Sequence, residues 1–472
     1  MHGEAMNSGW RIYSSGLLLV ALCGCDVILN VDGDRRGYCE EGKLSCINNA
    51  PRLCGANLKW EEPLLECAGV EPVCSQGRCT SVLQIDAGGR HTCAVLADHT
   101  VACWGANHAG QLGDRTLENR SEAVAVAGLT NVRKIAVGGS DVSARSCAIL
   151  EDETVTCWGG VNGFDVLGDG SDWNQLEPAA VPELSEVQEL ALGSGHSCAL
   201  IRGGAVKCWG MNNFGQAGQA LTRPTVYPPM QVLGPGPIKS ISAGGSHTCA
   251  ITMDDRITCW GSNGLGQCGV DLEKWDWGTA VPPSQTVRDL DEVESVDTGY
   301  YHTCAVGRYQ GIKQAICWGA QNCGQLGGIG HQDCDITTCA ASPTNVEDEC
   351  RISTPTVVWS DPDEAARSRV HSPSLGARHS CIISGENRVK CWGRNYHFQS
   401  KSSSTEFALV EDSGIRDFDQ VGYVLKLNVG SNHACAIREL GEVVCWGQNQ
   451  VGECGNGAFT PASLPLPVHW NL

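Results

Sequence analysis

The sequence predicts an all-β protein in which a small disulfide-rich unit precedes a seven-bladed β-propeller. The strongest observation is a motif, G-x-x-H-[ST]-C-A followed by C-W-G and N-x-x-G-Q-x-G, that recurs seven times with some departures. A second is the spacing of the copies, most of which begin about fifty residues apart, a period typical of solenoids and propellers. A third is composition: 28 cysteines and 58 glycines in 472 residues favour a turn-rich fold held by disulfides.

Each copy also has the pattern of antiparallel strands. Two runs of β-forming residues flank a polar turn, as in HTCAVLADHTVACWG at residues 91–105, and this predicts a β-hairpin. Four-stranded blades around an axis leave only short sheet edges, and seven is a usual number of blades. The propeller is expected to span residues 82–472. The first cysteines of the seven copies are Cys93, Cys147, Cys198, Cys249, Cys304, Cys381 and Cys435.

Two cysteines in each copy are placed to form a cross-strand disulfide. In six copies they are ten residues apart, so a hairpin centred on the polar turn sets them opposite each other on one face. Opposed residues of an antiparallel pair lie within reach of a disulfide. The fifth copy has a longer hairpin tip and a separation of thirteen. The predicted pairs are Cys93–Cys103, Cys147–Cys157, Cys198–Cys208, Cys249–Cys259, Cys304–Cys317, Cys381–Cys391 and Cys435–Cys445.

A histidine stands two residues before the first cysteine in six copies, and Arg145 takes its place in the second. Histidine is a common metal ligand, so a metal ring is one hypothesis. A propeller, however, places the same repeat position once in every blade, so these histidines would be spread around the ring. Ligands for one ion would instead converge from two or three places. We therefore expect structural histidines that bond to strand or turn backbone. They are His91, His196, His247, His302, His379 and His433.

Two further features concern how the blades pack. The C-terminal tail, Pro461 to Trp470, has the Pro- and Val-rich character of the strands that precede later copies, and the first copy lacks such a strand. Pairing the tail with the first blade would close the ring and remove two exposed edges.

The tryptophans of the C-W-G segments are expected to pack between blades, with the next glycine allowing close backbone approach. They are Trp104, Trp158, Trp209, Trp260, Trp318, Trp392 and Trp446.

The N-terminus resembles a bacterial lipoprotein signal peptide over residues 1–24. Its apolar run, 17–22, is too short to span a bilayer. The run ends in the sequence LCGC (22–25), which resembles a lipobox, and Cys25 fits the lipid-accepting position because a small residue precedes it. An ordinary cleaved signal peptide is the alternative. Residues 25–38 are expected to form a polar tether.

Residues 39–80 are predicted to be a separate unit stapled by three disulfides, because so short a segment buries too little core to fold unaided. No C-x2-C spacing occurs in it, which disfavours a zinc site. Six cysteines allow fifteen connectivities, and all remain open. The unit could bind a partner or serve only as a spacer. Its cysteines are Cys39, Cys46, Cys54, Cys67, Cys74 and Cys79.

The longest interval between copies indicates an insertion at about 323–375. It carries acidic residues and enough cysteines for two disulfides, which favours an ordered protrusion, although an inert loop is an equal alternative. Cys268 and Cys454 occupy one repeat position in non-adjacent blades, so a bond between them is not expected. Cys268 could instead pair with Cys323. The insertion cysteines are Cys323, Cys334, Cys339 and Cys350.

The repeats resemble those of the regulator of chromosome condensation family, over about 82–472 and through several fixed positions in each copy. They look like a bacterial extracytoplasmic, cysteine-containing type. The resemblance implies a propeller used as a binding platform. The eponymous member is a nucleotide-exchange factor for a nuclear GTPase on chromatin, but a signal peptide, many disulfides and a formal charge of −20 contradict that role here. A secreted bacterial member that inhibits β-lactamases is a closer analogy in compartment.

No motif in the chain indicates catalysis. A nucleophile elbow and a phosphate loop are both absent from the sequence, so we expect a non-enzymatic protein with no catalytic residue, no metal ligand and no cofactor. The net negative charge disfavours nucleic acid as a partner.

The expected partner is a protein or glycan in the bacterial cell envelope or outside the cell, bound by a monomer that is lipid-anchored on the periplasmic or cell-surface side, or secreted. One alternative is an inhibitor or regulator of an envelope enzyme. A hydrolase or lyase acting in the central channel is another. The binding residues are not identified, but loops where the repeat fails, in copies two and six and in the insertion, are the best candidates.

Overall fold

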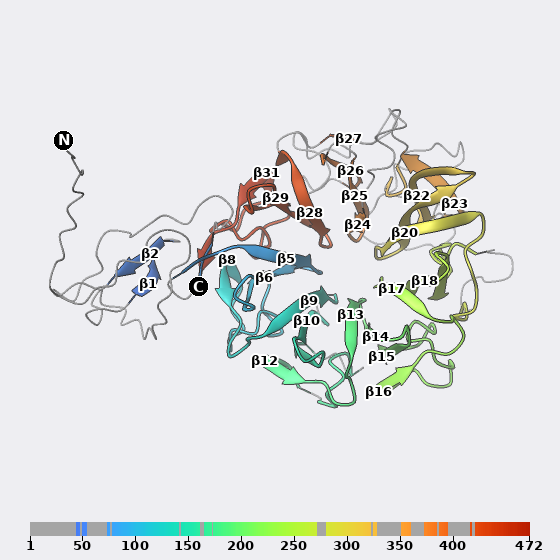
Figure 1. Ribbon diagram of the computed structural model, residues 1–472, viewed down its shortest axis with the longest axis horizontal. Coiled ribbons are helices and arrows are strands. Elements are labelled where there is room, and N and C mark those ends of the chain that lie inside the picture. The colour runs from blue at the N-terminus through green and yellow to red at the C-terminus, as the bar shows by residue number, and fades with distance from the viewer. Residues whose placement is uncertain are drawn as a thin grey trace, which may run out of the picture.

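Each copy of the repeat folds into an antiparallel sheet, and seven such sheets form a ring around a central axis (Figure 1). The predicted all-β, seven-bladed propeller is confirmed. This computed structural model describes residues 44–47, 50–53, 73–75, 78–140, 143–160, 165–171, 173–270, 280–321, 324–327, 351–359, 372–384, 387–394, 416–417 and 421–472. The predicted signal peptide, Cys25, the tether and the four insertion cysteines lie outside these residues.

The blades follow one another in chain order. Blade 1 consists of β5 (Val82–Ala87), β6 (His91–Leu96), β7 (Val101–Gly105) and β8 (Arg120–Ala125). Blade 2 consists of β9 (Val132–Gly138), β10 (Arg145–Leu150), β11 (Val155–Gly159) and β12 (Gln175–Ala180). Blade 3 consists of β13 (Val187–Leu192), β14 (His196–Ile201), β15 (Val206–Met211) and β16 (Thr225–Gln231). Blade 4 has β17 (Ile238–Ala243), β18 (His247–Thr252) and β19 (Ile257–Gly261).

The remaining blades complete the ring. Blade 5 consists of β20 (Leu290–Thr298), β21 (His302–Tyr309), β22 (Ile312–Ala320) and β23 (Arg351–Trp359). Blade 6 consists of β24 (Pro373–Leu375), β25 (His379–Ile383), β26 (Val389–Gly393) and β27 (Arg416–Asp417). Blade 7 consists of β28 (Val424–Val429), β29 (His433–Arg438), β30 (Val443–Gly447) and β31 (Ala462–Pro467). Strands β23 and β24 fall within residues 323–375, which the sequence predicted to be an insertion, but they belong to blades 5 and 6. The insertion is therefore shorter than predicted.

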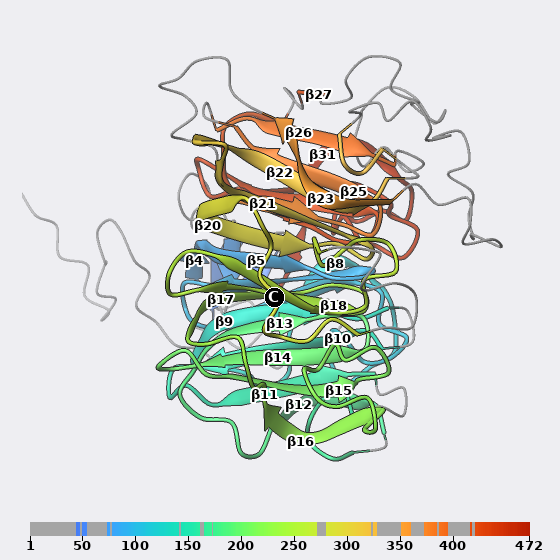
Figure 2. The same ribbon diagram turned by 90° about the vertical axis from the view of Figure 1, so that its right-hand side faces the viewer.

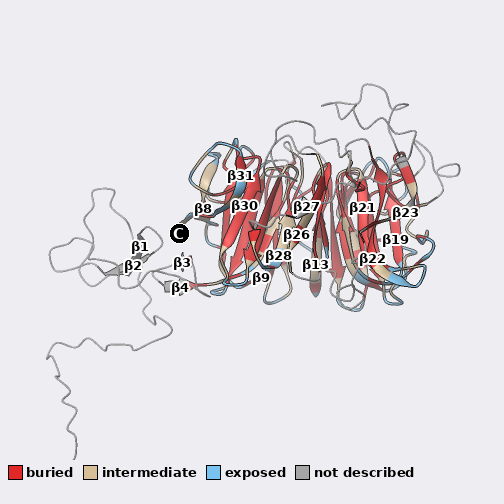
Figure 3. Ribbon diagram, turned by 90° about the horizontal axis from the view of Figure 1, so that it is seen from above, coloured by how far each residue is buried: buried red, intermediate tan, exposed pale blue. Residues whose placement is uncertain are grey.

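We call the successive strands of a blade A, B, C and D, with A nearest the axis. Seen from the side, the strands run along the axis of the ring (Figure 2). Because neighbouring strands are antiparallel, the A–B and C–D loops lie on one face of the ring, the C–D face. The B–C hairpin tips and the D–A connections lie on the opposite one, the D–A face. Buried residues fill the strands, and exposed residues collect in the loops at both ends (Figure 3).

The ring closes in a different way from the prediction. The tail strand β31 is the D strand of blade 7, so the tail's main strand does not complete blade 1. Blade 1 has its own D strand, β8, and only β32 (Trp470–Asn471) crosses over to pair with it, in parallel. The prediction was wrong because the Pro-rich strand that precedes each copy completes the previous blade. Trp470 meets the edge of Trp104 at 5.9 Å between ring centroids.

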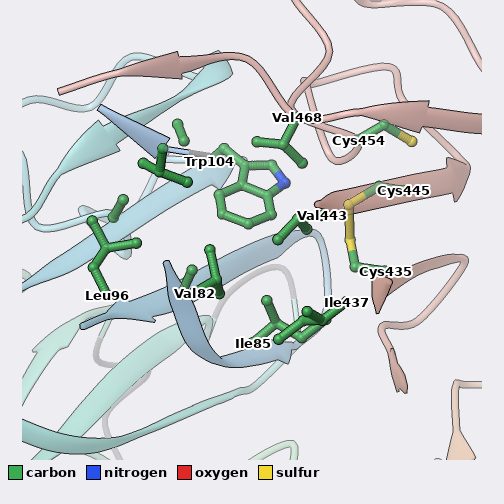
Figure 4. Packing of buried hydrophobic residues seen from close by; sticks show 14 of the residues in the cluster. Val82, Ile85, Leu96, Trp104, Cys435, Ile437, Val443, Cys445, Cys454 and Val468 are labelled. Carbon is green, nitrogen blue, oxygen red and sulfur yellow. A yellow bond between two sulfur atoms is a disulfide. The ribbon is translucent and has the colours of Figure 1, made fainter. Parts of the chain in front are cut away.

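A cluster of apolar side chains seals this joint between blades 7 and 1. Trp104 of blade 1 lies among Val443 and the Cys435–Cys445 disulfide of blade 7 (Figure 4). Trp158 packs in the same way on the side chains of blade 1, and each later tryptophan lies in a cluster shared with the blade before it. The expected packing of tryptophan between blades is therefore observed.

Two hairpins precede the propeller. The first joins β1 (Leu44–Ile47) to β2 (Ala50–Leu53), and the second joins β3 (Val73–Ser75) to β4 (Arg78–Thr80). The register of the second sets Cys74 opposite Cys79. Val73 is fully buried in the cluster between blades 1 and 7. Since β4 leads directly into the start of β5, this unit joins the propeller at the D–A face.

Candidate functional site

The paired cysteines of each hairpin form a disulfide that joins strands B and C. Within each pair the Cα atoms are 4.1 Å apart, and the two residues are direct partners in the strand register, as for Cys249 and Cys259. All fourteen sulfurs belong to buried residues between the blades. The bonds are Cys93–Cys103, Cys147–Cys157, Cys198–Cys208, Cys249–Cys259, Cys304–Cys317, Cys381–Cys391 and Cys435–Cys445.

Two further cysteines have no disulfide. Cys268 and Cys454 are both free and buried, so the alternative pairing of Cys268 with Cys323 is wrong. The Cys268 thiol lies in the core between blades 4 and 5 and donates to the Ser262 carbonyl over 3.2 Å. Burial raises the pKa of both thiols, Cys454 also through the neighbouring Glu453 charge, which makes them poor nucleophiles.

Five of the six repeated histidines form a hydrogen bond to a hydroxyl side chain of the next blade, and not to backbone as expected. The Nε2 atom of His247 lies 2.9 Å from the Thr303 hydroxyl, which is the [ST] of the following copy. We call this circle of contacts the histidine–hydroxyl ring. Its other histidine pairs are His91–Ser146 at 3.0 Å, His196–Thr248 at 2.7 Å, His302–Ser380 at 2.8 Å and His433–Thr92 at 2.8 Å.

At the seam between blades 4 and 5, the hydrogen bonds around the hydroxyl fix the protonation of the histidine. Thr303 Oγ1 donates its only proton to the Gln267 carbonyl over 2.8 Å, and Trp318 Nε1 donates to the same carbonyl over 3.0 Å. The hydroxyl must therefore accept a hydrogen bond from His247 Nε2, so the His247 imidazole is neutral with its proton on Nε2. Burial agrees, because it lowers the pKa of all six histidines to about 3.

The glycines of the motif are explained by close packing around this ring. A side chain at Gly193 would come within 2.4 Å of His196 Cε1 and 2.5 Å of the Gly244 carbonyl in the next blade. Gly105 of C-W-G has φ +103°, a conformation that favours glycine, and a Cβ there would lie 2.5 Å from the Arg90 carbonyl.

In blade 2, Arg145 replaces histidine and makes a larger set of bonds to blade 3. Its Nε donates to Ser197 Oγ at 3.0 Å, and its Nη2 donates to the carbonyls of Gly193 at 3.1 Å and His196 at 2.5 Å. Burial lowers the pKa of Arg145 to about 9, so the side chain is still a cation at neutral pH. This departure from the repeat preserves the contact between blades and leaves Arg145 inaccessible.

The central channel holds a cavity of about 490 Å³ that is lined by the A strands. Asp86 lies in it, where burial raises its pKa to about 7, and it accepts bonds from Val137 N at 2.6 Å and Asn428 Nδ2 at 2.7 Å. Asp297, whose pKa burial raises to about 6, accepts from Leu375 N at 2.8 Å and from a serine hydroxyl of blade 4. Both carboxyls therefore join neighbouring blades.

The channel cavity is lined by acidic side chains, among them Asp86, Glu189 and Asp297, and by no histidine. The buried histidines stand one to a blade in their ring and do not converge at one channel mouth. Within the described ranges, no group of three or more His, Cys, Asp or Glu side chains is placed to hold a metal ion. Likewise, no helix in the described part of the chain is long and apolar enough to cross a membrane.

The C–D loops expose large apolar side chains in consecutive blades. Trp173 of blade 2 is 78% exposed, and Leu117 of blade 1 and Phe459 of blade 7 are 53% and 52% exposed. Leu221 extends the series into blade 3. We call these four residues the apolar arc. Tyr227 lies beside it, since a side chain at Gly170 in the Trp173 loop would contact its hydroxyl at 2.5 Å.

Sequence reasoning found the cysteine pairs but missed the partners that complete the site. The hydroxyl partner was present in the motif as [ST], and its recurrence beside histidine was the available signal. The channel residues share no such signal, because the equivalent positions in the first three blades are Asp86, Ala136 and Ala191. The apolar arc was missed because its members lie in loops that differ from blade to blade.

These features define a closed propeller whose repeated residues build the scaffold and whose loops vary. A family model described as an RCC1-like domain matches residues 53–406, and one for the regulator of chromosome condensation (RCC1) repeat matches 424–453. The first match covers most of the chain, so this protein belongs to the RCC1-like family.

Several relatives match along much of the chain. The ultraviolet-B receptor UVR8 of Arabidopsis thaliana is 26% identical over 81% of both proteins, and protein pim1 of Schizosaccharomyces pombe is 26% identical over 74% of this chain and 66% of its own. The human ubiquitin-protein ligase HERC4 is 30% identical, but the match covers 52% of this chain and only 23% of the ligase. The crystal structure of human WBSCR16 shares the fold, with a TM-score of 0.57 and 20% identity over 77% of this chain and 92% of that one.

Proposed function

We propose that this propeller is a non-enzymatic platform that binds a protein partner through the apolar arc on its C–D face. The observation that carries the proposal is the exposure of Trp173 together with Leu117 and Phe459 in adjacent blades. Exposed aromatic and apolar side chains on loops held by a rigid scaffold are typical of binding surfaces.

The position of the N-terminal unit supports this choice of face. The described end of the unit joins the propeller at the start of β5, on the D–A face and opposite the apolar arc. The C–D loops are also the longest connections in blades 1, 2 and 3, whereas the B–C tips contain only a few residues. Leu233 on the D–A face is 74% exposed and provides a control.

The test is capture of partners from an envelope extract by the intact protein and by two variants. One variant changes Leu117, Trp173 and Phe459 to serine, and the control changes Leu233 to serine. We expect the first to lose the captured proteins and the control to retain them, with both variants keeping the parent melting temperature. Retention by the arc variant would contradict the proposal, and loss of glycans with no loss of proteins would identify a glycan platform.

We further propose that a lipid on Cys25 holds the protein at a bacterial cell envelope. The support is the lipobox-like sequence LCGC at 22–25 and the disulfides, which require an oxidising compartment. Cys25→Ser should release the protein from membranes into the soluble fraction. Continued membrane association would contradict the lipid anchor without affecting the proposal for the apolar arc.

A further inference from the structure

One contact is missing from the histidine–hydroxyl ring, at the seam between blades 6 and 7. Ala434 stands where the other copies have serine or threonine, so blade 7 offers no hydroxyl to His379. Both ring nitrogens of His379 lack a hydrogen-bond partner, and His379 and Ala434 are both fully buried. A buried polar group without a partner is costly, and it favours any state in which water can reach it.

In the described part of blade 6, the channel also lacks a side-chain link across this seam, which only the backbone bond from Ala377 N to the Ser431 carbonyl crosses there, at 3.2 Å. Elsewhere a side chain near the axis reaches the next blade, as Asp86 and Asp297 do, and blades 7 and 1 are joined by Asn428, whose Oδ1 accepts from Ala87 N at 2.7 Å. In blades 2 and 3, alanine occupies the position equivalent to Asp86, and other side chains form the link to the next blade. Ser240 donates to Glu189 over 3.1 Å between blades 3 and 4, and Lys134 donates to the Gln188 carbonyl over 3.0 Å between blades 2 and 3.

Among the described residues, apolar, aromatic and backbone contacts hold this seam. A cluster that includes Val424 and Trp446 fills it. Arg388 lies over the Tyr423 ring at 5.3 Å, and Val424 N donates to the Asn387 carbonyl over 3.0 Å. At each of the other six seams, a hydrogen bond from a histidine or from Arg145 also joins the two blades.

We propose that the propeller opens first between blades 6 and 7, which makes the apolar interior of that seam accessible. The repeated blade offers a matched set of reporters. In five blades, a backbone amide in or near the first turn-side residues of the A strand donates across the seam to the preceding hairpin tip: Val132 to His99, Val187 to Glu153, Ile238 to Gly204, Val293 to Asp255 and Val424 to Asn387, over 2.9–3.1 Å. Amide exchange at these positions reports opening of each seam.

Residue-resolved hydrogen exchange of the whole protein tests the proposal. Val424 should exchange faster than the other four amides. Ala434→Ser, which restores the hydroxyl, should slow exchange at Val424 about fivefold, the effect of one added hydrogen bond. Thr248→Ala should produce the converse effect at the seam between blades 3 and 4, with faster exchange at Ile238.

The control is a second alanine-to-serine substitution on the same strand. Ala436 is fully buried in the same cluster but faces no histidine of the ring, so Ala436→Ser should not slow exchange at Val424. The proposal is overturned if Val424 in the parent protein exchanges no faster than the other four amides. It is also overturned if Ala434→Ser, folded as judged by its unchanged disulfides and circular dichroism, leaves exchange at Val424 unchanged.

Discussion

At the scale of single residues, one polar position per blade does most to join the blades. His247, Thr303, the Gln267 carbonyl and Trp318 form a buried network in which each hydrogen has an acceptor. Similar contacts recur at other seams with serine in place of threonine, Arg145 substitutes for one histidine, and the seam between blades 6 and 7 lacks the contact. Because a buried network loses more than one contact when a member is removed, its residues should be sensitive to isosteric changes.

The first prediction concerns the hydroxyl. Thr303→Val keeps the shape but leaves His247 Nε2 and the Gln267 carbonyl short of a bond, so the free energy of unfolding should fall by about 1–3 kcal/mol. Urea unfolding with intact disulfides measures this. Thr156→Val, at a nearly buried threonine outside the ring, is the control and should change stability by less than about 0.5 kcal/mol. Equal effects of the two changes would contradict the role of the network.

The second prediction concerns pH. Burial holds the pKa of the ring histidines near 3, below the ordinary 6.5, so between these values the unfolded chain binds more protons. Stability should therefore fall as pH falls from 6.5 toward 3. Three buried carboxyls act in the opposite sense, because burial raises the pKa of Asp86 to about 7, that of Asp297 to about 6 and that of Glu189 above its ordinary value, so the folded chain binds more protons there; they are three groups against six.

The measurement is the urea midpoint between pH 7 and 4. Each histidine contributes a slope of up to about 1.4 kcal/mol per pH unit, so His302→Asn should flatten the profile as well as lower it. Thr156→Val, which removes no titratable group, should leave the slope unchanged. A midpoint that does not fall on acidification would show that these rings are not held neutral.

At the scale of elements, the B–C hairpin is the unit that the sequence predicts best. Its boundaries and its cysteine pairs follow from a constant spacing, and the structure places Cys198 directly opposite Cys208. Contacts between elements could not be read in the same way. Spacing along the chain does not say that Thr303 faces the previous blade, nor that β31 completes blade 7 while only β32 reaches blade 1.

The third prediction belongs to this hairpin. Replacing Cys198 and Cys208 together by alanine should lower the free energy of unfolding by about 2–3 kcal/mol, since a short loop is no longer closed in the unfolded chain. Thermal unfolding of the double variant measures it. Cys268→Ala removes a buried thiol that is not in a disulfide and should cost about 1 kcal/mol. A double variant as stable as the parent would contradict the stapling role.

At the scale of the whole molecule, the ring is closed without a covalent bond between blades 7 and 1. Arg90 and Glu453 form an ion pair at 3.0 Å in which the Glu453 side chain is only 1% exposed, and His433 binds Thr92. The β32 pairing and the contact of Trp470 with Trp104 add to this joint. Several contacts thus close the ring. Between the described residues of blades 6 and 7, in contrast, the hydrogen bond from the histidine is missing.

The fourth prediction follows from this closure. Truncation after His469 removes β32 and Trp470, and it should lower the free energy of unfolding by about 2 kcal/mol through lost burial. Removing Leu472 alone is the control and should have a smaller effect. If the two truncations have equal effects, β32 does not contribute to closing the ring.

The central claim is that the repeats build a scaffold and that the C–D face binds a protein. Site-specific photo-crosslinking in intact cells tests it most directly, with the same crosslinking residue placed at Trp173 or at Leu233. We predict a discrete crosslinked protein from position 173 and none from position 233. Crosslinking from position 233 but not from 173 would contradict the account and place binding on the D–A face.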